Sequence, residues 1–184
     1  MNLSGQHRID APRLRVWQGL NDAAILARIT PGCESLSRLE DGFVATVRQP
    51  IGPLVARFEG RGRIVERLPP ERLALRGRGD AGPAGLIDGE VEITLEESDP
   101  QTTLLRYHAT AVLQGQLAAL DSWLIEQTAE TFAQEICTRF AREMSEPPAL
   151  LPRHSPPEEG LAPVVWVSGF VAVTLALVMA CAMM

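Results

Sequence analysis

The chain has 184 residues, with 17 basic and 23 acidic side chains and a formal net charge of −6. This length predicts one folded domain, and the acidic balance excludes nucleic-acid binding as the main role, because phosphate contacts need a surplus of positive charge. Every basic residue is arginine. The absence of lysine excludes a P-loop lysine, a Schiff-base lysine and a lysine general base.

The first 29 residues predict one strand and two short helices. Residues 3–9 alternate in the manner of a half-buried strand. A short helix is expected over residues 10–20, with Asp10 as its N-cap. A second helix begins at Asn21 or Asp22 and ends before Pro31 and Gly32, because proline and glycine interrupt helices.

Residues 43–113 predict several strands, each with one apolar and one charged face. The strand patterns fall at 43–48, 54–64, 73–79, 90–96 and 105–113. This pattern is typical of an antiparallel sheet with one face in water. The arginine and glutamate rows on the wet face are expected to pair across strands.

From Leu117 to Met144 the apolar spacing changes to three and four residues, which predicts one long amphipathic helix. The economical packing lays this helix across the apolar face of a strongly curved sheet. The sequence therefore predicts an α+β fold in which a curved antiparallel sheet wraps around a C-terminal helix, within one domain over residues 1–144.

Small residues occupy several positions expected to face that helix, namely Gly60, Gly62, Gly77, Gly79, Ala109 and Ala111. Missing side chains in a core mean either a close helix or an open cavity, and we favour the cavity. The residues expected to line it are Phe43, Val47, Phe58, Gly62, Leu75, Ile93, Tyr107, Ala109, Leu124 and Phe132.

Polar groups suited to chemistry are few at the inward positions. Tyr107 is a candidate donor to a quinone carbonyl, although a backbone partner for its hydroxyl is the favoured interpretation. His7 is interpreted as a core histidine in preference to a general base. No nucleophile elbow, carboxylate pair or metal-ligand spacing is found, and the three cysteines are far apart. We therefore expect no enzyme activity and no bound metal.

The C-terminal 40 residues differ from the rest of the chain. Residues 145–163 contain six prolines and predict an extended linker. Residues 164–184 carry no charge, and about 31 Å of helix would match a bilayer core. A buried core helix is the alternative, but such helices usually have a polar face. The N-terminus is too polar for a signal peptide, so we expect a single-pass C-terminal anchor in the cell inner membrane with a cytoplasmic domain.

Several segments resemble a known family. They are IDAPRLRVWQGLNDAAILARITPGCESL (residues 9–36), IGPLVARFEGRG (51–62), GRGDAGPAGLIDGEVEITL (77–95) and TLLRYHATAVLQGQLAALDSWLI (103–125). Together they resemble the G-type subunits of carbon monoxide dehydrogenase, a family of the START/polyketide-cyclase-like (SRPBCC) superfamily. The resemblance implies a helix-grip fold around an apolar cavity. It also implies an accessory protein that recruits a molybdenum-containing carbon monoxide dehydrogenase or related molybdenum hydroxylase to the membrane and holds or shuttles a quinone.

Three functions follow as hypotheses. The first is a membrane-anchored accessory protein that binds a quinone or lipid-like hydrophobe and takes part in electron transfer. The second is a pure membrane adaptor with a closed core and no ligand. The third is a cyclase or aromatase, which the same fold supports but which needs converging polar groups inside. We favour the first, with a membrane, a molybdenum enzyme and a hydrophobic small molecule as partners.

Overall fold

The computed structural model describes residues 1–51 and 54–146, without the side chain of Leu54. Seven strands form one antiparallel sheet in the order β1-β7-β6-β5-β4-β3-β2. The elements in chain order are β1 (Asn2–Ile9), α1 (Arg13–Gly19), α2 (Ala23–Ile29), β2 (Cys33–Arg38), β3 (Gly42–Ile51), β4 (Leu54–Leu68), β5 (Arg72–Asp80), the 3-10 turn η1 (Gly82–Ala84), β6 (Leu86–Asp99), β7 (Thr102–Gln114), the 3-10 turn η2 (Leu117–Ala119) and α3 (Ser122–Ser145).

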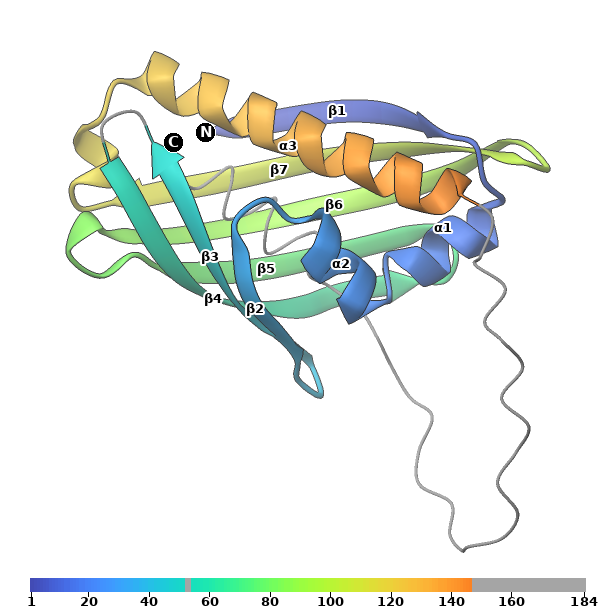
Figure 1. The fold of residues 1–184 in the computed structure, drawn as a ribbon, viewed down its shortest axis with the longest axis horizontal. Helices are drawn as coiled ribbons and strands as arrows, with labels where there is room; N and C mark the ends of the chain where they lie inside the picture. Colours follow the sequence, from blue (N-terminus) through green and yellow to red (C-terminus); the bar gives the residue numbers. More distant parts are fainter. Residues whose placement is uncertain (52–53, 147–184) are drawn as a thin grey trace, which may run out of the picture.

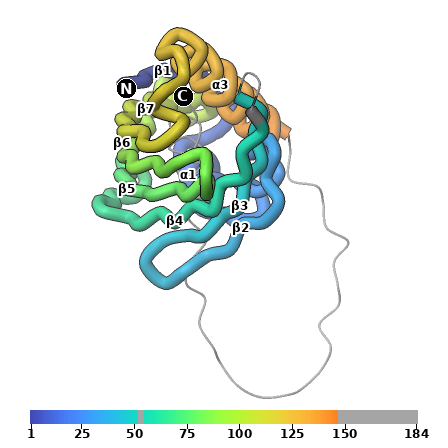
Figure 2. Tube along the Cα trace, turned by 90° about the vertical axis from the view of Figure 1, so that its left-hand side faces the viewer, coloured from blue at the N-terminus to red at the C-terminus, as the bar shows by residue number. Residues whose placement is uncertain are grey.

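The helices all lie on one side of the sheet. Figure 1 shows α3 running across this side, with α1 and α2 beside it. Figure 2, turned by 90°, shows the strands curving from β1 round to β2. Helix α3 contacts β1, β3, α1 and α2. The predicted α+β architecture, a curved antiparallel sheet with a long helix across it, is confirmed for the described residues.

The alternation of apolar and polar residues forms the strands as predicted. In β7 the buried positions are Leu105, Tyr107, Ala109 and Ala111, while Arg106, His108 and Thr110 between them are exposed. Opposite faces of a strand receive alternate side chains. The apolar set of each strand therefore faces the helices, and we call this the inner face; the charged set faces water on the outer face.

Strand β2 is not among the predicted strands. Its residues, CESLSR, contain one large apolar side chain and do not alternate clearly. The strand exists because β3 offers it a ladder of backbone partners from Cys33 opposite Val47 to Arg38 opposite Phe43, with a bulge after Cys33. Pairing of this kind depends on tertiary context more than on the strand's own composition.

The long helix begins later than predicted. Residues 117–119 form a 3-10 turn, and α3 starts at Ser122 because the Asp121 carboxylate accepts a hydrogen bond from the Trp123 backbone N–H at 2.9 Å. The predicted apolar stripe is therefore wrong over residues 117–128. Ile125 and Ala129 are buried in place of the predicted Leu124 and Thr128, and the stripe is correct from Phe132 to Phe140.

The two short helices are positioned by different caps. Asp10 is not an N-cap, since α1 begins after Pro12 without a side-chain cap. Asp22 caps α2 as predicted, its carboxylate accepting hydrogen bonds from the backbone N–H groups of Ala24 and Ile25. The pair contacts β2, β6, β7 and α3, and covers one end of the inner face.

Candidate ligand-binding site

The predicted cavity residues come together on the inner face and on α3. Phe43 lies directly opposite Gly62, and Val47 opposite Phe58, in the β3–β4 pair. Ile93 lies opposite Tyr107 in the β6–β7 pair. Directly opposite residues of an antiparallel pair share one face. The sheet therefore presents these side chains together to the helices, as the sequence pattern predicted.

Most of the ten residues are buried. Phe43, Phe58 and Ala109 are 0% exposed, and Tyr107 is 8% exposed. Phe132 is the buried member contributed by α3, whereas Leu124 lies at the edge of the packed face and is half-buried. Ile125 and Ala129 are the buried α3 residues that the prediction omitted. A start of the helix phase at Asp121 would have found them.

Glycine and alanine line the middle of the inner face. Gly60 pairs with Gly79 and Gly62 pairs with Gly77 across β4 and β5. Ala109 and Ala111 continue the small residues onto β7 and are at most 3% exposed. Two neighbouring glycine pairs leave the sheet without side chains at its centre, where a ligand or another element is able to approach the backbone closely.

Tyr107 brings a hydroxyl to the inner face. Its side chain lies against Gly5 of β1, where an added Cβ would be 2.5 Å from the tyrosine hydroxyl. Glycine at position 5 thus gives the ring its place. His7, on the same strand and the same face, is half-buried opposite Leu105.

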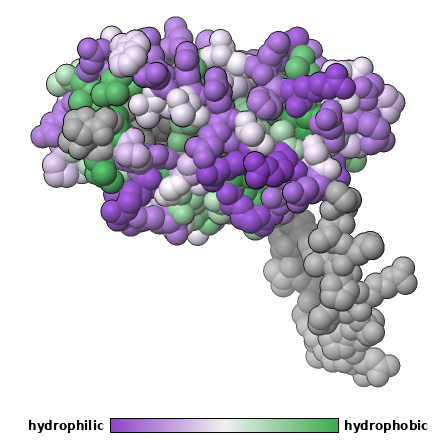
Figure 3. Space-filling view, turned by 45° about the horizontal axis from the view of Figure 1, so that its top comes forward, coloured by the Kyte–Doolittle hydropathy of each residue, from purple (hydrophilic) through white to green (hydrophobic). Residues whose placement is uncertain are grey.

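The outer face carries mostly charged side chains. A hollow of about 570 Å³ lies over β4 and β5, where four arginines line it with Asp41, Glu59, Asp80 and Asp88. Arg78 is paired with Asp88 at 2.8 Å, and Arg76 is paired with Glu90 at 2.9 Å. The cross-strand ion pairs predicted for the wet face are therefore present. Hydrophilic side chains also dominate the face seen in Figure 3, with apolar patches between them.

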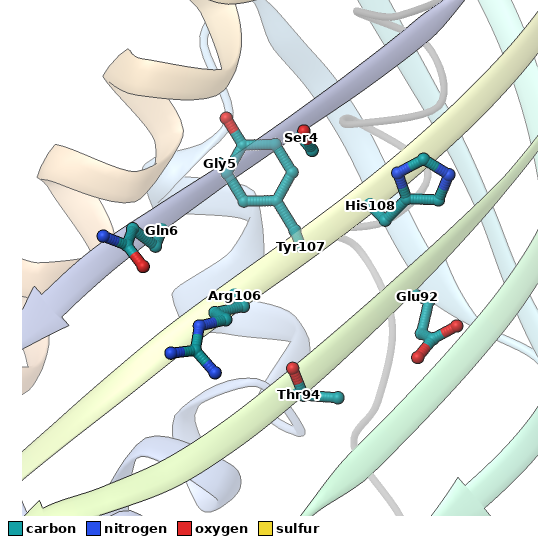
Figure 4. Close-up of a pocket in the computed structure, with 8 residues that line it drawn as sticks. All are labelled: Ser4, Gly5, Gln6, Glu92, Thr94, Arg106, Tyr107 and His108. Carbon is teal, nitrogen blue, oxygen red and sulfur yellow. The ribbon is translucent and has the colours of Figure 1, made fainter.

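A polar groove lies near Tyr107. It has a volume of about 420 Å³ and is lined by Ser4, Gly5, Gln6, Glu92, Thr94, Arg106, Tyr107 and His108, and Figure 4 shows the tyrosine ring crossing β1 there. His108 lies opposite Ser4 on β1 and opposite Glu92 on β6. The groove holds one imidazole and one carboxylate. Among the described residues no group of three or more His, Cys, Asp or Glu side chains is placed to hold a metal ion.

The two described cysteines are poor nucleophiles. Burial raises the pKa of Cys137 to about 12. Burial also raises the pKa of the half-buried Cys33, although a weak hydrogen bond from its thiol to the Ser35 carbonyl is present. The thiolate is the reactive form, so both side chains remain neutral thiols near pH 7.

No helix within residues 1–51 and 54–146 is both long and apolar enough to cross a bilayer. The predicted linker over residues 145–163 lies outside the described residues except at its first two positions, and the predicted membrane span over 164–184 lies wholly outside them.

Solved structures share this architecture. A conserved protein from Geobacillus kaustophilus matches with a TM-score of 0.74 and 24% identity, over 79% of this chain and 95% of that chain. The ZhuI aromatase/cyclase from Streptomyces sp. R1128 matches with a TM-score of 0.58 and 17% identity, over 78% and 93%. A START superfamily protein from Mycobacterium smegmatis matches with a TM-score of 0.60 and 10% identity, over 78% and 96%.

These likenesses define the fold class, which is the START-like helix-grip fold. A search of curated proteins finds no match to the chain. The family model of CoxG, the G-type subunit of carbon monoxide dehydrogenase, matches residues 5–145. The chain therefore belongs to the CoxG family and is an accessory protein of the carbon monoxide dehydrogenase system, which confirms the resemblance found in the sequence.

Proposed function

We propose that this chain is a non-catalytic, membrane-anchored accessory protein that recruits a molybdenum-containing carbon monoxide dehydrogenase-like enzyme and binds or shuttles a quinone or similar hydrophobe. Family membership over residues 5–145 supports the accessory role. The uncharged segment 164–184 supports the anchor at the inner membrane, with the folded domain on the cytoplasmic side.

One observation carries the ligand part of the proposal. The centre of the inner face is made of Gly60, Gly62, Gly77 and Gly79, and aromatic and branched side chains surround it. A flat quinone ring and its isoprenoid tail are apolar and suit such walls. In this proposal the Tyr107 hydroxyl donates to a carbonyl of the ring, because a tyrosine is able to donate a hydrogen bond while its ring packs in an apolar wall. The quinone would supply the electron-accepting group, and the protein would position it.

The experiment is extraction of the bound molecule. The full chain is purified from native membranes in a mild neutral detergent, extracted with organic solvent and measured by mass spectrometry. We expect about one quinone-class molecule per chain. Ala109→Phe places a large side chain on the inner face and should abolish recovery. His108→Phe adds the same side chain to the exposed face of the same strand and should not.

The adaptor hypothesis makes a different prediction. If the inner face binds nothing, extraction recovers no hydrophobe from the wild type, while the chain still carries the partner enzyme to the membrane fraction. A circular dichroism spectrum and a thermal unfolding curve for each variant separate loss of ligand from loss of fold, because overpacking a core by itself costs about 1–3 kcal/mol.

A further inference from the structure

Two arginines occupy inner-face positions of the sheet, where most residues are apolar. Arg38 at the end of β2 lies directly opposite Phe43, and Arg67 on β4 lies directly opposite Leu73. Phe43 and Leu73 are core residues with 0% and 2% exposure. Because directly opposite residues share a face, both arginines belong to the face that the helices cover. Arg38 is half-buried, and Arg67, near the end of its strand, is exposed.

A β-bulge aims Arg67 inward. The register of β4 against β5 shifts between Ile64 and Glu66. Before this shift Arg61 and Arg63 are exposed on the outer face, where they line the hollow over β4 and β5. After it, the same odd-numbered series reaches the opposite face at Arg67. Bulges commonly re-aim a side chain beside a functional site.

Arg67 points toward the corner between α1 and α2. Its Nη2 donates a hydrogen bond to the Asn21 side-chain oxygen at 3.2 Å. Asn21 lies between the two helices, and its own amide donates to the Trp17 carbonyl. This corner is on the side of the sheet that carries the helices (Figure 1). Arg67 therefore holds its guanidinium beside the helical cover.

Arg38 has a shielded donor without a partner. Its Nη1 is hidden from solvent and makes no hydrogen bond within the described part of the chain. Glu40 and Asp41, which follow it in the hairpin, are exposed. Arg72 also has a shielded unbonded nitrogen, but its charge is balanced by Glu92 at 3.0 Å and Glu66 at 3.5 Å. Arg38 thus combines an unbonded donor with an uncompensated charge.

The two guanidinium groups are neighbours. Burial lowers the pKa of Arg38, and the positive charge of Arg67 lowers it further, with no carboxylate acting in the opposite direction. Like charges near each other repel, the more so where one is partly removed from water, and a shielded donor left unbonded is costly. An oxyanion between them would relieve both costs, because guanidinium groups bind carboxylates and phosphates with paired hydrogen bonds.

We propose that Arg38 and Arg67 form an oxyanion-binding site on the inner face at the α1–α2 corner, which takes a carboxylate or phosphate. The oxyanion is either free or the head group of an amphiphile whose apolar part lies along the inner face near Phe43. The site is independent of the proposed quinone, since its ligand is charged and its residues are not among the ten predicted for the cavity.

Binding of defined anions tests this site. The full chain in neutral detergent and chloride buffer is titrated by calorimetry with inorganic phosphate, hexyl phosphate and hexanol. We expect phosphate or hexyl phosphate to bind, and Arg38→Gln and Arg67→Gln each to weaken that binding by about tenfold or more. Arg61→Gln removes the same charge from the outer face of β4 and should change the affinity by less than about twofold, because an exposed distant charge is screened.

The probes separate the two sources of the oxyanion. Equal affinity for phosphate and hexyl phosphate supports a free anion, and tighter binding of hexyl phosphate supports an amphiphile head. Hexanol, which has no charge, should not distinguish wild type from Arg38→Gln. Equal losses in the Arg38, Arg67 and Arg61 variants, or no anion binding by the wild type, would overturn the site.

Thermal unfolding gives a second readout that does not depend on affinity. Without anion, Arg38→Gln should be at least as stable as the wild type, because it removes an uncompensated cation. With saturating anion the wild type should gain stability and the variant should not. A variant that is less stable in the absence of anion would show that Arg38 is a structural residue, and the proposal would fail.

Discussion

At the scale of single residues, the absence of a side chain decides how closely two strands approach. Gly42 begins β3, and a Cβ added there would lie 1.9 Å from the backbone oxygen of Gly62 on β4. Backbone atoms of a paired strand do not move aside cheaply, unlike the end of a flexible side chain. Position 42 therefore requires glycine for contact, and its conformation is not the reason.

Gly42→Ala should lower the free energy of unfolding by about 3 kcal/mol, since overpacking against backbone is at the costly end of its range. Urea unfolding of the full chain, followed by circular dichroism, measures the change. Gly82→Ala is the comparison. Gly82 has a φ of +58° but no atom within 4 Å of an added Cβ, so its cost should stay near about 1 kcal/mol. Equal losses at the two positions would contradict this account.

At the scale of elements, Glu34 ties three neighbouring strands together. Its two carboxylate oxygens lie 2.8 Å from Arg48 Nε on β3 and 2.8 Å from Arg57 Nε on β4. Arg48 and Arg57 are directly opposite each other, a pairing that repels on its own. Hydrogen bonds from Arg48 and then Arg57 are the main reasons why the pKa of Glu34 is lowered.

A lowered pKa in the folded state predicts how stability depends on pH. The ionised Glu34 stabilises the fold fully above the pKa that the group has in the unfolded chain, and this contribution is lost as the pH falls through the lower folded value. Glu34→Gln should therefore flatten the stability curve below about pH 5. Thermal unfolding between acidic and neutral pH measures it.

The control for Glu34 is Glu126→Gln, which changes an exposed carboxylate on α3. It should leave the slope of the curve unchanged. High salt should bring wild type and Glu34→Gln closer together, because exposed ion pairs are screened. A wild-type slope that persists in Glu34→Gln would mean that other carboxylates dominate the acid response.

At the scale of the whole molecule, the proposed function divides the chain into a folded part and an anchor. Deletion of residues 164–184 should move the chain from the membrane fraction to the supernatant and take the partner enzyme's membrane association with it. Sedimentation of cell membranes followed by blotting measures both proteins. Restoring an unrelated apolar span of equal length should restore both, because the anchor acts through its hydrophobicity.

The truncated chain should keep its helix and strand content in a circular dichroism spectrum, since the residues of the described core all lie within residues 1–146. Continued sedimentation of the truncated chain with membranes would contradict the anchor. Loss of the partner alone, with this chain still in the pellet, would place the docking surface within the C-terminal segment.

Much of the fold could be predicted because short-range patterns express it. Alternation in Leu105, Tyr107, Ala109 and Ala111 defines β7 and its buried face before any partner is known. Asp22 marks the start of α2 for a local reason, since its carboxylate bonds the first N–H groups of the helix. The predicted start of α3 is wrong because Leu117 and Leu120 continue the apolar spacing, while the backbone turns there and Asp121 begins the helix.

Period and residue type are local properties, so the order of amino acids alone was enough to predict the fold class, the family and the inward set of Phe43, Phe58 and Ala109. The segment CESLSR becomes a strand only through pairing, since its ladder comes from β3. Three-dimensional pairing also brings Arg38 and Arg67 to one face. A one-residue register shift reverses every later side chain of a strand, and nothing in the composition of β4 marks where that shift falls.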